Sequence, residues 1–425
     1  MGNKQIVKIL MAVFAVRPIV DLFYNVTIGG INPAGFLAIL ISALALLSIG
    51  INNFKLKMSY PMFAFVVYTL IITLIHVREF SNIADWLRIF SGVAFFFAVA
   101  PYIDVEAFMK YARVFMISTL VPIVFTFLQV AKILPYQYFD WVNGVHVSRA
   151  TGGYPQPAVL TRFLVFGLLY ALYFFNNSPR KHKKWYAVYI AANLIAVFFS
   201  YHRTGYFLSV LIIFLYTCFY YRGSLKKILP KLIAVVLIVS VVIFIINYYG
   251  LIQLDSSGFE KLLGFSNIIK TQDGHTTLHL RGRGAIATEY LGELFSTPDC
   301  IFGFGKDLNE ATGSTLIDAD MDIIRILWSY GIVGLIVWLI FVIDMFKTVF
   351  YDTRRYHNDF LSIAKIGLII YIVFGWTMDT IIMPNFMIHV YLLVGLTEYR
   401  TWMQSPAEDT SSAFVKNGRL GVINT

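Results

Sequence analysis

Long apolar segments alternate with short polar ones along most of this chain. Each apolar run is roughly 18 to 25 residues long, the length that a helix needs to cross about 30 Å of hydrocarbon. A helix also satisfies its own backbone hydrogen bonds, as the water-free interior of a bilayer requires. The pattern predicts about twelve membrane-spanning helices, at residues 7–26, 32–50, 60–76, 83–101, 112–131, 158–175, 185–200, 204–221, 228–248, 321–345, 361–381 and 385–399.

The lysines and arginines of the short loops indicate how these spans are oriented. Loops with the sequences NNFKLK, SPRKHKKW, YRGSLKK and DTRRYHND follow even-numbered spans, and basic residues mark the cytoplasmic side of a membrane protein. We therefore expect a cytoplasmic N-terminus, and an even number of spans returns the C-terminus to the same side. The first span has no small-residue cleavage site after it, so we interpret it as retained.

The predicted organisation has four parts: spans one to nine in residues 1–249, a large external loop in 250–319, spans ten to twelve in 320–402, and a cytoplasmic tail in 403–425. The loop is too long for a connector and too short for an ordinary independent domain. We expect it to fold back on the membrane as a cap. Its sequence predicts a short helix from near Gly284, with Glu289 and Glu293 on one face.

Composition agrees with this membrane class. Of 425 residues, 58% are hydrophobic and 14% are charged, and the mean hydropathy is +0.70. The net charge of +10 is accounted for by cytoplasmic loops that contact lipid headgroups, so no nucleic-acid partner is predicted. Cys218 and Cys300 are too far apart in this topology to suggest a disulfide, and they lack metal-ligand spacing. No nucleotide-binding motif is present, and no cofactor or metal is expected.

Arginine is enriched on the predicted external side. About eight arginines lie there against about four lysines, although topology alone does not favour arginine over lysine. The arginine fork binds phosphate through paired hydrogen bonds and stays charged when partly desolvated. The enrichment predicts an anionic, phosphate-bearing ligand at the external face, near Arg78, Arg88, Arg149, Arg162, Arg203, Arg281, Arg283 and Arg325. The alternative is local pairing, of Arg88 with Asp85 and of Arg325 with Asp322.

Three acids, Asp318, Asp320 and Asp322, alternate where the tenth span begins. Helix capping explains at least one of them. A hard cation could also use such carboxylates, although the pattern is not that of a calcium loop. A third interpretation is a general base for a sugar hydroxyl, which needs one carboxylate in the right place.

Two further features are weaker indications of a site. Gly303 and Gly305 could present backbone N–H groups to an anion, but a tight turn is the plainer interpretation. His202 is a second candidate base, although histidines at a membrane surface are more often interfacial residues. His275 and His279 have i,i+4 spacing without a third ligand, so we do not expect zinc.

The order of several short motifs resembles a known family. RATGGYPQP (Arg149 to Pro157) is followed by HRTG (His202 to Gly205), by RGR (Arg281 to Arg283) and an FGFG turn in the large loop, and then by DADMDIIRILWSYGIVGLI. Arg17, Pro18 and Asp21 also resemble the family's start. The chain is thus similar to the O-antigen polymerase and O-antigen ligase superfamily, which makes bacterial surface polysaccharides.

The resemblance implies an all-α, polytopic glycosyltransferase of the GT-C-like kind, whose one large external loop carries short helices. Its donor would be a polyprenyl-pyrophosphate-linked oligosaccharide, used at the external face of the bacterial cytoplasmic membrane. By position, Arg203 matches an arginine that faces the donor pyrophosphate, and Arg281 or Arg283 matches a second one. The ligase branch has a histidine where this chain has Asp320, which favours a polymerase.

In the mechanism that we predict, guanidinium groups stabilise the pyrophosphate leaving group in place of a metal. Arg203, Arg281, Arg283, Arg149 and Arg325 are the candidate pyrophosphate ligands. Asp320 or Asp322 would accept the proton of the attacking hydroxyl, and His202, Glu289 and Arg88 are secondary candidates. Expected partners are lipid-linked oligosaccharides, membrane lipids, a chain-length regulator and a flippase.

Three other functions stay open. An O-antigen ligase would move the glycan to a lipid core acceptor. A flippase or secondary transporter would need a path across the whole membrane, with charged residues in both halves. A non-catalytic assembly component would bind lipid-linked glycans through the same arginines without turnover.

Overall fold

A computed structural model describes most of the chain. The described residues are 3–27, 33–51, 59–76, 80–100, 102–142, 145–220, 269–272, 275–278, 291–292, 294–305, 322–352, 359–377, 380–381 and 383–403. The predicted ninth span, residues 228–248, lies outside them.

The described chain is mainly helical. Its longer helices are α1 (Asn3–Ala15), α3 (Pro33–Ile51), α4 (Ser59–His76), α5 (Phe80–Val99), α6 (Val105–Val130), α7 (Pro157–Asn177), α8 (Arg180–Phe199), α9 (Arg203–Tyr220), α14 (Asp322–Phe346), α15 (Asp359–Thr377) and α16 (Pro384–Met403). Shorter elements are α2 (Arg17–Val20), η1 (Asp21–Phe23), η3 (Pro298–Cys300) and η4 (Lys347–Asp352). Most of these bounds agree with the predicted spans to within a few residues.

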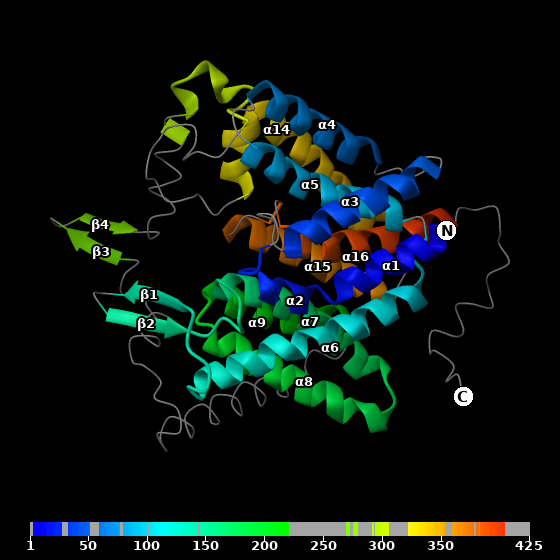
Figure 1. Ribbon diagram of the computed structural model, residues 1–425, viewed down its shortest axis with the longest axis vertical. Coiled ribbons are helices and arrows are strands. Elements are labelled where there is room, and N and C mark those ends of the chain that lie inside the picture. Colours follow the sequence, from blue (N-terminus) through cyan, green and yellow to red (C-terminus); the bar gives the residue numbers. More distant parts are fainter. Residues whose placement is uncertain are drawn as a thin grey trace.

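The helices pack side by side in one bundle (Figure 1). Helix α14 contacts α4, α3 and α16 contact α5, α7 contacts α8 and α9, and α15 contacts α9 and α16. One continuous hydrophobic core includes residues from α1 through α16. The two β-hairpins among the described residues lie at one end of the bundle, at the left of the view, while α1 begins at the opposite end.

Four described helices are long and apolar enough to cross a membrane: α6, α7, α9, and α14 together with its extension to Tyr351. Six more apolar helices are shorter. Large apolar side chains are exposed on the outer faces of α4, α9 and α14, as expected where helices face lipid. The helical membrane class is thereby supported, and the count of twelve spans stays a prediction.

The first predicted span is not continuous. Helix α1 ends at Ala15, and the chain then forms the short helices α2 and η1. Pro18, near the start of α2, has no N–H for a continuing helical ladder, and its ring clashes with the preceding turn. The expectation of one unbroken helix over residues 7–26 was therefore wrong, and the break brings the polar side chains of Arg17 and Asp21 into the buried part of the bundle.

The hairpins are a second difference from the all-helical expectation. Strands β1 (Tyr138–Val142) and β2 (Val145–Arg149) pair antiparallel, as do β3 (Ile269–Gln272) and β4 (His275–Leu278). An Asn-Gly and an Asp-Gly dipeptide join the strands of these pairs, and such dipeptides favour two-residue hairpin turns. The large loop therefore carries a strand pair at residues 269–278 that the sequence did not predict, while the described residues 291–292 and 294–295, at the end of the predicted helix, are helical.

The loop after β2 is held against α6. The side-chain oxygen of Gln129 accepts hydrogen bonds from the backbone N–H groups of Thr151 (2.9 Å) and Gly152 (3.0 Å). Gly152 has φ +63, and a Cβ atom there would lie 2.7 Å from the Pro122 carbonyl oxygen. Only glycine fits this conformation and this space without strain. The contact fixes the entry to α7, which carries part of the candidate site.

Candidate functional site

A surface pocket of about 450 Å³ lies between α9 and α15. Six residues line it: Arg203, Thr204, Phe207, Ile372, Val373 and Trp376. Each helix contributes residues at i, i+1 and i+4, the spacing that puts side chains on one helical face. The rings of Phe207 and Trp376 are 59% and 62% exposed, so the pocket opens on the outer surface of the bundle. Its volume is in the range of about 300 to 1,000 Å³ that is typical of small-molecule sites.

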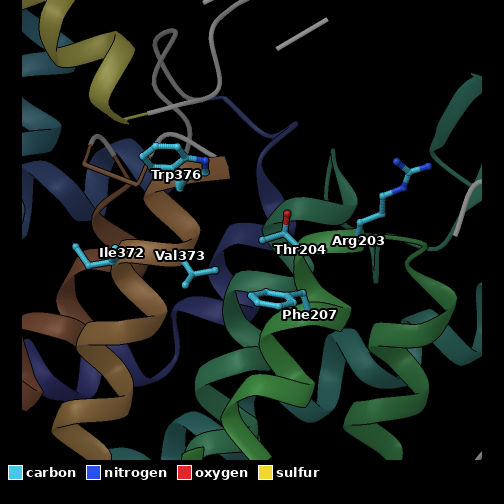
Figure 2. A pocket seen from close by; sticks show the side chains of 6 residues that line it. All are labelled: Arg203, Thr204, Phe207, Ile372, Val373 and Trp376. Atoms are coloured by element: carbon cyan, nitrogen blue, oxygen red, sulfur yellow. The ribbon is translucent and has the colours of Figure 1, made fainter. Parts of the chain in front are cut away.

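Arg203 stands at the edge of this pocket. It is the first residue of α9, so it adds a full charge to the positive end of the helix dipole. Figure 2 shows its guanidinium pointing away from the apolar side chains, while Phe207, Val373 and Ile372 line the opening below. The site therefore joins a cationic rim to an apolar interior.

Arg149 shapes the turn that precedes Arg203. Its guanidinium is buried and donates to the carbonyl oxygens of Ser200 (3.2 Å) and Tyr201 (2.7 Å) at the C-terminus of α8. It also lies over the ring of Tyr138 in β1, 5.5 Å from the ring centre. A cation at the end of a helix satisfies carbonyl groups that have no partner within the helix. These contacts give Arg149 a positioning role for the α8–α9 turn.

His202 lies in the same turn. Its Nδ1 atom is 2.8 Å from the hydroxyl oxygen of Thr161 in α7 and accepts from the N–H of Gly205 at 3.3 Å. A Cβ atom on Gly205 would be 2.7 Å from the Thr161 methyl carbon, so the glycine allows α7 and α9 to approach closely. The contacts of His202 are those of a side chain that caps α9, and its role as a base stays a prediction.

The end of α15 connects the pocket to two other predicted site residues. Phe374 packs near the His202 ring, with 6.3 Å between ring centres. A Cβ atom on Gly375 would be 2.5 Å from the Asp322 carboxylate. Trp376 lines the pocket. Three consecutive residues of α15 therefore have different neighbours: Phe374 lies near His202, Gly375 lies against Asp322, and Trp376 lines the pocket.

Asp322 is buried at the start of α14. Its carboxylate accepts from the N–H of Thr380 (2.6 Å), from the N–H of Ile381 (3.0 Å) and from the Thr380 hydroxyl. It thus holds the connector, which we define as the described residues 380, 381 and 383 between α15 and α16 together with the first two residues of α16, Pro384 and Asn385. Buried carboxylates are tolerated where donors of this kind surround them.

Two buried arginines are linked to the same connector, Arg162 directly and Arg17 through Asp21. Arg162 of α7 is 3.1 Å from the sulfur of Met383. Arg17 donates to Asp21 at 3.0 Å, and Asp21 accepts from the amide of Asn385 at 3.2 Å. Buried charged side chains from α2, η1, α7 and α14 are therefore grouped around the connector. Desolvation makes each of these charges costly unless it is paired.

Tyr154 completes the contact with α2. Its hydroxyl donates to the carbonyl oxygen of Pro18 at 2.5 Å. Burial, together with the nearby charge of Asp21, raises the pKa of the Tyr154 phenol well above its usual value. The phenol is therefore a neutral hydrogen-bond donor that ties the loop before α7 to the first broken helix.

The remaining predicted site residues are spread over the molecule or undescribed. Arg88 is exposed on α5, and Arg325 is half-buried in the first turns of α14. Four predicted site residues, Asp320, Arg281, Arg283 and Glu289, lie outside the described residues. The structure thus brings Arg149, His202, Arg203 and Asp322 to the same part of the bundle.

Sequence reasoning missed the apolar half of the site. Phe207, Ile372, Val373 and Trp376 belong to runs in which nearly every position is apolar, so periodicity did not distinguish them. Thr380 and Asn385 were also missed, because their partners are far away in sequence. For Thr380 and Asn385, the only indication in the sequence was the position of a polar residue near the end of a predicted span.

Comparisons with known proteins give little further information. No family model matches the sequence, and no curated protein matches it. Among solved structures, the chain is similar to one from a peptidoglycan synthase complex that coordinates polymerization and crosslinking, with a TM-score of 0.37 and 11% sequence identity. That match covers 86% of this chain and 97% of the other. A TM-score this low carries no argument about function.

Proposed function

We propose that the protein is a membrane glycosyltransferase that joins polyprenyl-pyrophosphate-linked oligosaccharide repeat units into a surface polysaccharide, such as an O-antigen, a capsule or an exopolysaccharide. The observation that carries the proposal is the pocket between α9 and α15. Its apolar lining and the arginine at its rim match a ligand with an isoprenoid tail and a charged phosphate head.

Both the apolar lining and the cationic rim of the pocket would stabilise such a ligand. Apolar contacts with Phe207, Val373 and Trp376 would remove isoprenoid surface from water at about 25 cal/mol per Å². Arg203 and the N-terminus of α9 would attract the pyrophosphate. Because the pocket opens on the outer face of the bundle, the lipid tail could enter sideways from the bilayer.

In the proposed reaction, a hydroxyl of the acceptor repeat unit attacks the anomeric carbon of the donor. A new C–O bond forms as the bond to the phosphate oxygen breaks, and the electron pair stays with polyprenyl pyrophosphate. A carboxylate takes the hydroxyl proton. Fixed guanidinium groups stabilise the charge that grows on the leaving group and act most strongly in a site that excludes water.

The carboxylate is Asp320 or Asp322 in this proposal. Three donors engage Asp322, and such contacts favour a positioning role, since they occupy the carboxylate lone pairs that a general base would need. Asp320, two residues earlier, is therefore the preferred base. Arg281 and Arg283 are proposed as further pyrophosphate ligands.

The setting of the reaction is part of the same proposal. The protein would lie in the bacterial cytoplasmic membrane with both termini in the cytoplasm and the site at the external face. A flippase would supply its donor, and a chain-length regulator would act with it. An O-antigen ligase uses a different acceptor, and the experiment below distinguishes a ligase from a polymerase.

The proposal is tested by the length of surface polysaccharide in cells that carry wild-type protein or Arg203→Ala at matched membrane abundance. We expect the variant to collapse the ladder to single repeats and to accumulate lipid-linked units. A full ladder that is no longer attached to the lipid core would indicate a ligase. An unchanged ladder in the variant would contradict a role for Arg203 in the site.

A further inference from the structure

Helix α14 is broken in its middle by a turn from the large loop. Gly331 has φ 66 and ψ −171 inside the helix, a conformation that only glycine adopts easily. The break frees backbone groups, and residues 301–305 pair with them. We call residues 294–305 the inserted segment.

The pairing is made by backbone atoms. The N–H groups of Phe304 and Gly305 donate to the carbonyl oxygens of Trp328 (2.9 Å) and Ser329 (2.8 Å). In return, the N–H of Val333 donates to the carbonyl oxygen of Ile301 at 3.1 Å. The N–H of Gly305, one of the two donors that could have cradled an anion, is therefore used by α14, which favours the plainer interpretation of this sequence as a turn.

The contacts of the inserted segment with α14 and α4 show how far it lies from the ends of these helices. Gly331 comes nine residues after Asp322, which is about 13 Å along a helix. On the other side, the Tyr68 hydroxyl of α4 donates to the carbonyl oxygen of Tyr330 (2.8 Å), and its oxygen lies 3.4 Å from the carbonyl oxygen of Phe302. Tyr68 precedes the end of α4 by eight residues, or about 12 Å. Phe302 thus lies well below the ends of both helices.

The outer side of the inserted segment is apolar. Phe295, Ile301 and Phe302 are 57%, 48% and 55% exposed. The backbone contact between Ile301 and Val333 makes this surface continuous with the exposed apolar face of α14, which includes Ile332 and Ile336. The inner side packs on the first turns of α14, where Leu294 meets Ile324 and Trp328.

From these contacts we propose that the inserted segment is re-entrant: it enters the outer half of the bilayer and presents Phe295, Ile301 and Phe302 to lipid acyl chains. Irregular backbone is tolerated at membrane depth where it packs against other protein groups, and here α14 pairs with backbone groups of Ile301, Phe304 and Gly305 while Tyr68 lies beside the Phe302 carbonyl. We assign lipid as the partner of this apolar surface because the surface continues the outer face of a membrane-spanning helix.

Nitroxide labels test this topology in the full-length protein. We would replace Cys218 and Cys300 by serine, label Ile301→Cys or Phe302→Cys, and reconstitute each protein in phosphatidylcholine and phosphatidylglycerol vesicles. Collisions with oxygen report lipid exposure, and collisions with a water-soluble nickel chelate report water exposure. Ile340→Cys on the outer face of α14 is the lipid control, and Gln137→Cys in the loop after α6 is the water control.

We expect labels at 301 and 302 to lose collisions with the nickel chelate and to match the oxygen-to-nickel ratio of Ile340→Cys. A ratio like that of Gln137→Cys would overturn the proposal, because the segment would then face water. Loss of both collision types would also overturn it, because another part of the protein would cover the segment. A Phe295→Cys label gives an independent reading should a substitution at 301 or 302 prevent folding.

Discussion

The carboxylate of Asp322 accepts hydrogen bonds from both the backbone N–H and the hydroxyl of Thr380, although 58 residues separate them in sequence. This contact joins the start of α14 to the connector between α15 and α16. Since Gly375 of α15 lies against the same carboxylate, the pair also supports the wall that carries Trp376. A buried acid thereby positions one side of the candidate pocket.

Thr380→Val should lower the stability of the folded protein. The substitution keeps the shape of the side chain and removes one hydrogen bond to a buried carboxylate, which is worth about 1.5 to 3 kcal/mol. The matched control is Thr69→Val, which removes a bond from a buried hydroxyl to the carbonyl of Val66 in its own helix. Thermal unfolding in detergent should show a clearly lower Tm for Thr380→Val, and equal values would argue against the capping role of Asp322.

Arg203→Ala should reduce activity without reducing stability. The side chain is exposed, and surface substitutions usually change stability by less than about 0.5 kcal/mol. The loss of one group that stabilises charge in the transition state costs about 100- to 1,000-fold in kcat. Lys110→Ala, which breaks an exposed ion pair with Glu106, is the control that should keep both properties.

Arg149→Ala should behave differently from Arg203→Ala. Arg149 is buried and caps α8 through two carbonyl groups, so its removal should lower the Tm as well as the activity. Arg149→Lys would keep the charge but not the paired donors, and should recover only part of the loss. If Arg149→Ala unfolded at the wild-type temperature, the positioning role of this arginine would be wrong.

Gly331→Ala should prevent α14 from adopting its break. A Cβ atom there would overlap the carbonyl group of Ile301, and the residue has φ +66. Strain of this kind costs about 1 to 3 kcal/mol before any overlap is counted. Gly292→Ala is the control, because nothing lies within 4 Å of its Cβ position. Folded yield by size-exclusion chromatography should fall for the first variant and stay unchanged for the second.

Val373→Phe should fill part of the pocket between α9 and α15. We expect the KM for the lipid-linked donor to rise by roughly tenfold, about 1.4 kcal/mol, with little change in kcat, because the tail binds equally in the ground and transition states. The matched control, Ile343→Phe, adds a ring to the exposed face of α14 and should change neither constant. Equal KM values for both variants would exclude the pocket as the tail site.

The sequence predicted the helices well because a bilayer leaves a long apolar segment few other conformations. The start of α9 at Arg203 and of α7 at Pro157 differ from the predicted bounds by one residue each. The break before Arg17 was missed, since the apolar run continues through Pro18 and outweighed the effect of the proline. The Asn-Gly and Asp-Gly hairpins were not predicted, because their strands are only four or five residues long and carry a weaker pattern than the long apolar segments.

The site could be predicted only in its charged half. Arg203 and His202 share a short motif, whereas Asp322 and Thr380, or Phe304 and Trp328, are brought together by packing that no local pattern records. The FGFG turn and the glycine of the SYGIVG sequence form one structural unit, although the sequence gives no sign that they meet. Their shared need for positive φ values at Gly303, Gly305 and Gly331 becomes visible only in three dimensions.

The most direct measurement is turnover by the purified protein in liposomes that contain a polyprenyl-pyrophosphate-linked oligosaccharide repeat with a radiolabelled sugar. A polymerase should convert single repeats into a ladder of longer lipid-linked chains and release one polyprenyl pyrophosphate for each linkage formed, and Arg203→Ala should do so about 100- to 1,000-fold more slowly. Lipid-linked repeats that stay unchanged with the wild-type protein, whether bound or moved across the bilayer, would contradict the proposed function.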